Sequence, residues 1–309
     1  MRPATAIPGT GNEAAVTVSE EQLKTWSNEG ATTAAAATYK SVQTALSRGK
    51  SLQKYKYDVY LQGSYGNRTN IYGNSDVDVV VELTSAFYSD TSLLPADQQA
   101  AYERQRSSSE LTFKGFRDDV HQALIDYYKA NLVRPRNKCT EILAHSGRQN
   151  ADIVPCLEYH LYTQFTSFKT DYHSGIKFFT RNENAPVVNF PRLHMQNGEA
   201  KNKRVKFYKQ TVRIFKNWRD RLIAEGRLAE GGAPSYFVEC LCWNIPDAPF
   251  GEDTWWKTTL ACLQFLHGAA FEQFMCQNGA IRLFGTAREQ WNIGDAQTFR
   301  RALIDDWNK

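Results

Sequence analysis

Residues 61–83, LQGSYGNRTNIYGNSDVDVVVEL, restrict the fold more than any other part of the chain. The stretch begins near a Gly-Ser pair, continues through a loop rich in Gly and Asn, and ends with Asp-Val-Asp before a run of valines. The density of β-branched residues predicts a strand that is buried on both faces. Two carboxylates therefore lie at the start of a strand that is predicted to be buried.

The two carboxylates belong to Asp76 and Asp78. Side chains at positions i and i+2 of a strand share a face, so we expect these two to project together about 7 Å apart. Carboxylates this close repel each other unless a cation lies between them. Oxygen ligands on a rigid strand suit Mg²⁺, which keeps waters and substrate phosphates as its other ligands. On its own, a D-x-D pair is more often a solvated strand end.

Two further features favour a functional site. Gly63 and Ser64 end the preceding predicted strand, where a hydroxyl and backbone N–H groups can hold phosphate. Asp152, in NADIVP, opens a later apolar strand and supplies a third carboxylate. Together these residues predict a two-metal site, in which one ion activates the attacking hydroxyl and the other neutralises a triphosphate leaving group.

The pattern along the chain predicts an α+β protein with a mixed strand-and-helix half followed by a helical half. We expect a disordered N-terminus at residues 1–17, a catalytic core at 18–199 and a helical domain at 200–309. The site is expected in the cleft between the halves. The individual expectations are a helix from residue 19 to about 47, a helix around 113–127, strands within 57–64, 76–83, 139–146 and 150–162, and a hairpin at 175–191 with its tip at 182–184.

The segment KFYKQTVRIFKNWRDRLIAE, residues 206–225, predicts an amphipathic helix. Its apolar side contains Phe207, Thr211, Ile214, Phe215, Trp218 and Leu222. Lys209, Arg213 and Lys216 line up on the opposite side, which is either solvated or faces the cleft and binds triphosphate. In the next predicted helix, Ser235 can cap the helix or bind phosphate, and Tyr236 is either a core aromatic or a platform for a base.

Composition excludes several classes of protein. The net charge of +4 does not indicate a DNA-binding protein. The N-terminal stretch lacks the apolar core of a signal peptide, and no apolar run reaches the roughly 20 residues of a membrane span. The six cysteines form neither a C-x-x-C motif nor a zinc ribbon, so we expect reduced thiols in a cytoplasmic protein.

The arrangement of Gly-Ser, Asp-Val-Asp and a third Asp on a later strand resembles the signature of the polymerase-β-like nucleotidyltransferases. Within that superfamily the chain resembles the bacterial cGAS/DncV-like nucleotidyltransferases, the CD-NTases of anti-phage signalling. The resemblance extends through NFPRLHMQNGEAKNK, YKQTVRIFKNW and PSYFVECLCWNIPD, and covers roughly residues 20–300. It implies a polymerase-β-like core of mixed sheet and helices packed on a C-terminal helical half.

The resemblance also implies roles for individual residues. Two Mg²⁺ ions, or Mn²⁺ in their place, would be held by three carboxylates, one of which also helps to deprotonate the acceptor hydroxyl. The implied metal ligands are Asp76, Asp78 and Asp152, with Asp152 as the base; the implied nucleotide contacts are Gly63, Ser64, Lys216, Ser235 and Tyr236, with Tyr236 stacked on a base.

The implied activity is the joining of ATP, GTP, UTP or CTP into a cyclic di- or trinucleotide, read by a downstream effector protein. Two alternatives stay open: a template-independent RNA or 2′–5′ oligoadenylate nucleotidyltransferase, which would need a strongly basic track, and a non-catalytic nucleotide-binding scaffold. Animal cyclic GMP–AMP synthase carries a zinc ribbon that docks DNA. This sequence has no such Cys/His cluster, so we expect no nucleic-acid activator. The motifs do not specify bases, linkage or ring size, although PSYFVECLCWNIPD resembles a clade that accepts pyrimidines.

Overall fold

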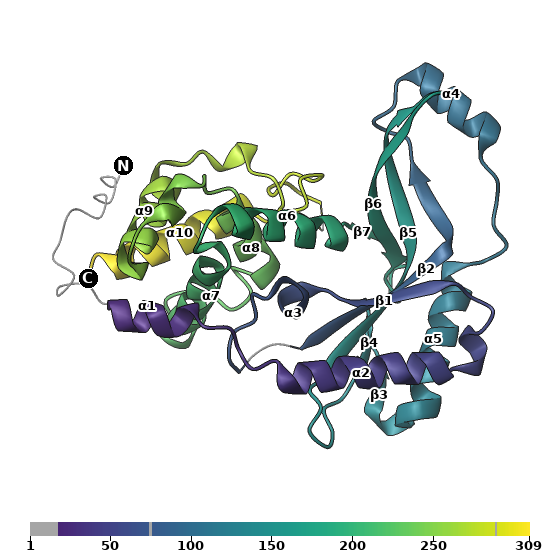
Figure 1. The fold of residues 1–309 in the computed structure, drawn as a ribbon, viewed down its shortest axis with the longest axis horizontal. Helices are drawn as coiled ribbons and strands as arrows, with labels where there is room; N and C mark the ends of the chain where they lie inside the picture. Colours follow the sequence, from purple (N-terminus) through teal and green to yellow (C-terminus); the bar gives the residue numbers. More distant parts are fainter. Residues whose placement is uncertain (1–17, 74–75, 288) are drawn as a thin grey trace. The chain divides into compact units, whose positions relative to one another are not determined.

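The computed structural model describes residues 18–73, 76–287 and 289–309 (Figure 1). The chain forms two compact units, each with its own hydrophobic core. The sheet unit consists of residues 31–66 and 76–193, and the described part of the helical unit consists of residues 18–30, 67–73, 194–287 and 289–309. The predicted division at residues 199 and 200 differs from this arrangement, since the chain enters the helical unit at His194 and two earlier segments also belong there.

The sheet unit is built on one mixed sheet. Within the described residues the strands are β1 (Tyr57–Leu61), β2 (Val77–Asp90), β3 (Val133–Pro135), β4 (Thr140–Ile142), β5 (Ala151–Phe165), β6 (Thr170–Phe179) and β7 (Pro186–Asn189). The order is β1-β2-β5-β4-β3, and β6 also pairs with β5 and carries β7. The β2–β5 pair is parallel and the others are antiparallel. This mixed sheet, with the C-terminal helices described below, confirms the predicted α+β class.

Helices cover the central strands of the sheet unit. Its helical elements are α2 (Thr33–Arg48), η2 (Lys50–Leu52), α3 (Gly63–Asn67), α4 (Ala96–Gln105), α5 (Phe113–Tyr128) and η3 (Ala130–Leu132), of which α3 ends in the helical unit. Helices α2 and α5 pack together against the sheet, and α4 lies at the far end of the long strands (Figure 1). Val79, Val80 and Val81 are fully buried, as the valine run predicts.

The prediction of a single helix from residue 19 to about 47 is wrong in one respect, because the structure has two helices there, α1 and α2. Ser19 caps α1 (Glu20–Ser27) as expected, with its hydroxyl accepting from Gln22 N at 3.2 Å. The chain then leaves the helix and passes close to a distant segment. Gly30 N donates to Asn70 O at 3.0 Å, and a Cβ on Gly30 would lie 2.6 Å from Ile71 O. A continuous helix cannot make this close approach.

The hairpin predicted at residues 175–191 is confirmed. Strands β6 and β7 pair antiparallel, with Lys177 opposite Val188. Their connection closes with Thr180 N donating to Ala185 O at 2.9 Å, and Asn184 adopts a φ of 51° in the turn. Asn is one of the residues that tolerate this left-handed conformation, so the local sequence determines the turn.

The helical unit has a core rich in aromatic residues. Besides α1, its elements are α6 (Pro191–Arg204), whose first turn precedes His194, α7 (Tyr208–Ala224), α8 (Ser235–Trp243), η4 (Ala248–Gly251), α9 (Trp255–Gly268), η5 (Phe271–Gln273) and α10 (Ile293–Trp307). Phe215, Trp218 and Trp307 are almost completely buried at its centre. None of the helices in the described ranges is both long and apolar enough to cross a membrane.

The expectation of an open cationic stripe on α7 is not met. Lys209, Arg213 and Lys216 are all buried. Lys209 pairs with Glu199 at 2.7 Å, and the Arg213 guanidinium donates to the carbonyl of Ser27 at 2.6 Å. The spacing of these residues along the sequence cannot show that other segments of the helical unit cover this side of α7 and supply hydrogen-bond acceptors.

Candidate active site

The three predicted carboxylates belong to neighbouring strand ends in the sheet unit. Asp78 lies directly opposite Asp152 in the parallel register of β2 and β5. Asp76 is exposed and immediately precedes β2, so it stands before the strand rather than within it. Because parallel strands β2 and β5 begin at the same edge, the sheet order brings together carboxylates that are more than seventy residues apart in the sequence.

The electrostatic environment of Asp152 shows that these carboxylates influence one another. Burial is the main cause that raises the pKa of Asp152, and the negative charges of Asp76 and Glu141 raise it further. A hydrogen bond from the Cys139 thiol and the positive charge of Arg136 act in the opposite direction. Sequence reasoning missed Cys139, because its approach to Asp152 depends on the pairing of β4 with β5.

The donor chemistry of this group fits a hard divalent cation. Carboxylate oxygens on a rigid sheet edge are the ligands that Mg²⁺ prefers, and a cation would offset the repulsion that acts on Asp152. In the described part of the chain, no group of three or more carboxylate, imidazole or thiol side chains is placed closely enough to form a metal site. The case for a divalent cation at these carboxylates therefore rests on the type of ligand and on the register of β2 with β5.

Gly63 and Ser64 adjoin this carboxylate group. Strand β1 ends at Leu61, Gln62 N donates to Asp78 O at 2.9 Å, and α3 begins at Gly63. Gly63 has a φ of +62°, and a Cβ at this position would overlap the Asp78 carboxylate, whose Cγ would be only 3.1 Å away. Glycine is thus required here both by the backbone and by the close approach of Asp78.

Replacing Gly63 with alanine should lower turnover by roughly a hundredfold, because a displacement of about 1 Å in a reacting group has that effect. The added methyl group must push the Asp78 carboxylate away from its present position. Gly73→Ala is the matched control, since Gly73 has a φ of +88° but nothing lies within 4 Å of the place that its new methyl group would occupy. Both variants should lose about 1–2 kcal/mol of stability from backbone strain. Equal turnover in the two variants would contradict the placement of Gly63 in the active site beside Asp78.

Lys216 lies in the helical unit, where it is only 1% exposed. Its ammonium donates to Glu239 Oε1 at 2.5 Å, to Thr69 Oγ1 at 3.1 Å and to Thr69 O at 3.2 Å. In this structure the predicted phosphate-binding lysine is therefore engaged by a buried carboxylate and by the segment that follows the Gly-Ser pair.

Glu239 is the centre of this buried polar cluster. It is 2% exposed, and besides Lys216 it accepts from Thr69 Oγ1 at 2.6 Å and from Asn67 Nδ2 at 2.8 Å, and contacts His194 Nε2 at 3.0 Å. Burial alone would raise the pKa of Glu239, but Lys216 and His194 outweigh it and hold the pKa well below the usual range. Sequence reasoning missed Glu239, although one acidic residue inside the apolar helix SYFVECLCW was a signal for it.

The Ser-Tyr pair begins α8. Ser235 Oγ accepts from Arg219 Nη1 at 3.0 Å. The Tyr236 ring stacks on His194 at a centroid distance of 5.0 Å and an interplanar angle of 25°, and its hydroxyl accepts from Asn278 Nδ2 at 3.2 Å. Tyr236 is half-buried, so it packs as a core aromatic on one side. Contact of either residue with a nucleotide stays a prediction.

Comparison with known proteins places the chain in a family. Residues 196–308 match the model of the cGAS/DncV-like nucleotidyltransferase C-terminal helical domain. The cyclic UMP-AMP synthase of Rhodothermus marinus is 43% identical over 94% of this chain and 98% of its own length. The cyclic nucleotide synthase CdnE01 of Staphylococcus haemolyticus is 36% identical over 95% of this chain and 100% of its own length. The chain is a cGAS/DncV-like nucleotidyltransferase.

The fold comparison agrees with this family membership. The structure of Rhodothermus marinus CdnE c-UMP-AMP synthase with Apcpp and Upnpp matches this nucleotidyltransferase with a TM-score of 0.85, covering 94% of this chain and 96% of the other. The predicted membership in the cGAS/DncV-like nucleotidyltransferases is thereby confirmed, and with it the prediction of an enzyme that transfers nucleotidyl groups.

Proposed function

We propose that this nucleotidyltransferase joins two nucleoside triphosphates into a cyclic dinucleotide. In each of two steps a ribose hydroxyl oxygen attacks an α-phosphorus, the bond to pyrophosphate breaks, and the hydroxyl proton leaves to a base. The second step closes the ring, so two pyrophosphates are released per product. The observation that carries the proposal is the register of Asp78 and Asp152 beside Gly63, in a chain with relatives named as cyclic nucleotide synthases.

In this proposal Asp152 accepts the proton of the attacking hydroxyl. The support for this role is the position of Asp152 at the start of β5, directly opposite Asp78, where a carboxylate can act as a general base. Asp76, Asp78 and Asp152 would hold two Mg²⁺ ions, which supply charge neutralisation and activation of the hydroxyl when bound. The backbone around Gly63 and Ser64 contacts the donor triphosphate.

We propose ATP and UTP as the first substrate pair to test. The support is the 43% identity over almost the whole chain to a protein named cyclic UMP-AMP synthase. Base choice depends on a few hydrogen bonds in each pocket, so this pair is a starting point within the larger set of pairs. We further propose that the product is a messenger in anti-phage defence, read by a separate effector protein.

The test is a screen with α-³²P-labelled ATP, GTP, CTP and UTP, singly and in all pairs, with Mg²⁺ or Mn²⁺, on nuclease-treated protein without added nucleic acid. Products are digested with alkaline phosphatase before chromatography. A cyclic product has no terminal phosphate, so digestion leaves its chromatographic mobility unchanged, whereas a linear product loses its terminal phosphates and changes mobility. A product that is only linear would favour the RNA or oligoadenylate alternative, and no product with any pair would favour the scaffold. Activity that disappears after nuclease treatment would contradict the expected independence from nucleic acid.

A further inference from the structure

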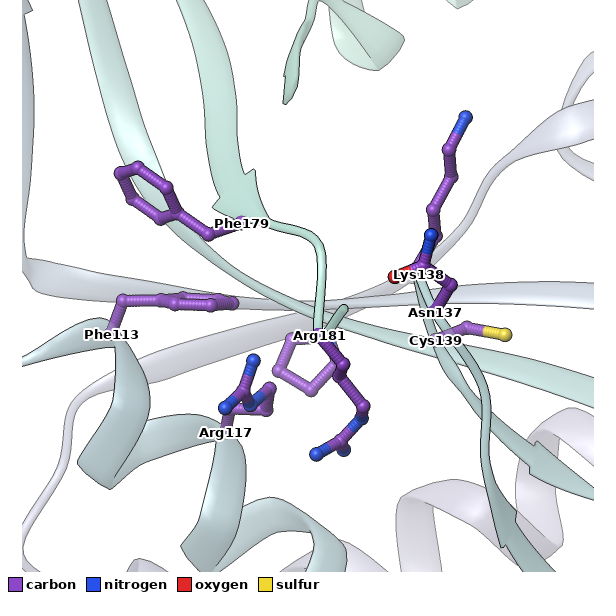
Figure 2. Close-up of a pocket in the computed structure, with 8 residues that line it drawn as sticks. Phe113, Arg117, Asn137, Lys138, Cys139, Phe179 and Arg181 are labelled. Atoms are coloured by element: carbon purple, nitrogen blue, oxygen red, sulfur yellow. The ribbon is translucent and has the colours of Figure 1, made fainter. Parts of the chain in front are cut away.

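A small basic pocket lies in the sheet unit between α5, the β3–β4 turn, β5 and the β6–β7 connection. It is lined by Phe113, Arg117, Asn137, Lys138, Cys139, Pro155, Phe179 and Arg181. Figure 2 shows the guanidinium groups of Arg117 and Arg181 near each other on the same side of the pocket, whereas the Lys138 ammonium points away. Two arginines thus converge on one concave surface.

Most of this pocket's lining lies on the opposite face of the sheet from the candidate active site, although Cys139, which also lines it, donates a hydrogen bond to Asp152. Pro155 lines the pocket and follows Asp152 by three positions in β5. The register of β5 with β2 is regular over this stretch, so side chains separated by an odd number of residues point to opposite faces. Phe113 and Arg117 both come from α5, which places the pocket on the α5 side of the sheet.

The two guanidinium groups are only partly compensated by the protein. The Arg117 side chain is 15% exposed, and its nearest acid among the described residues is Asp118, 3.5 Å from Nε. Asp118 is shared with Lys114, whose ammonium is 2.7 Å away. Arg181 Nη2 reaches Thr140 Oγ1 at 3.4 Å, which is long for a hydrogen bond. Burial lowers the pKa of Arg181, and the charge of Arg117 lowers it further.

We propose that this pocket binds a small phosphate-like anion between Arg117 and Arg181. Paired guanidinium groups present planar forks of donors that match phosphate oxygens, and an anion would offset the repulsion between them. The pocket encloses little space, because its volume of about 190 Å³ includes the open solvent at its mouth. An anion would therefore bind at the mouth, between the two guanidinium groups, either as inorganic phosphate or as one phosphate group of a larger ligand.

The inference is independent of the proposed cyclic product, because the test measures binding. Wild-type protein is titrated calorimetrically with sodium phosphate, with sodium chloride used to hold the ionic strength constant. Phosphate should bind the wild type, and Arg117→Gln with Arg181→Gln should weaken that binding by roughly tenfold or more. The charge-matched control is Arg104→Gln with Arg134→Gln, both exposed side chains of the same unit, which should bind as the wild type does.

Two further arms make the outcome decisive. Asp76→Asn with Asp78→Asn should keep the phosphate binding, which separates the pocket from the candidate active site. AMP replaces phosphate in a parallel titration: arginine-dependent binding of AMP identifies a phosphate group of a larger ligand, and binding of phosphate alone identifies the free anion.

If the double arginine variant does not fold, Arg181→Lys is used, which keeps the charge but loses the planar fork of donors. Absence of phosphate binding to the wild type, or equal binding by the pocket variant and the control, would overturn the proposal.

Discussion

Replacing both Asp76 and Asp78 with asparagine should lower product formation by at least about a thousandfold, since loss of bound metal removes several kcal/mol of transition-state stabilisation. The fold should survive, because Asp76 is exposed and Asp78 is only half-buried at the start of β2. Removing the charge of Asp76 also relieves its repulsion of Asp152, so the melting temperature should stay the same or rise. Turnover is measured with labelled triphosphates and stability by thermal unfolding.

The control for this variant is Asp97→Asn with Asp126→Asn, which removes the same charge from two exposed positions of the sheet unit. It should retain turnover within about twofold, since exposed charges far from a site have small effects. Normal turnover in the Asp76 and Asp78 variant would refute the site. A large fall in its melting temperature would instead indicate that the carboxylates support the fold.

Replacing Glu239 with alanine should lower the free energy of unfolding by about 3–5 kcal/mol, the usual effect of removing one partner of a buried ion pair. Glu239 and Lys216 are 2% and 1% exposed, so the variant leaves the Lys216 ammonium uncompensated in the interior. Thr69 and Asn67 also lose the acceptor of their hydrogen bonds. Glu239→Gln keeps the shape and an acceptor oxygen, and should lose less. The measurement is urea denaturation at neutral pH.

An exposed pair in the same unit provides the comparison. Asp253→Ala removes one partner of Lys257, which is 2.9 Å away with both side chains largely exposed, and should lower the stability far less than Glu239→Ala does. An equal loss in the two variants would show that the buried cluster contributes no more than a surface pair.

Acidification provides a second measure of the same cluster. The pKa of Glu239 is lower in the folded protein than the ordinary carboxyl value. The stability that this carboxylate contributes is therefore complete above the ordinary carboxyl range and is lost as the pH falls toward the depressed value. Glu239→Gln should flatten the acid side of the stability profile relative to the wild type.

Sequence reasoning succeeded where one segment determines its own structure. The valine run of β2, the apolar spacing of α5 and the Asn-rich turn of the β6–β7 hairpin are local signals, and the structure contains all three elements. It also identified Asp152 as a third carboxylate. The exact register of Asp152 with Asp78 depends on which strands are neighbours, and that is a property of the whole sheet.

The predictions that differ from the structure concern contacts between distant segments. The break between α1 and α2 arises where Gly30 meets Asn70 and Ile71, forty residues along the chain. Lys216 is buried because Glu239, on another helix, and Thr69, in an early loop, surround its ammonium. A helical wheel reports the direction of a side chain, but it contains no information on which segment covers that direction.

The segment that begins at Asn67 has a consequence for how the protein can be divided. It supplies Asn67 and Thr69 to the Glu239 cluster of the helical unit, yet residues of the sheet unit precede and follow it in the chain. A fragment cut before residue 194 would therefore retain Glu239 and Lys216 but lose two of the side chains that satisfy them. The chain passes from the sheet unit into the helical unit and back before residue 194, so the C-terminal half is not a transferable module. A chimera that exchanges this half between relatives must exchange the segment that begins at Asn67 as well.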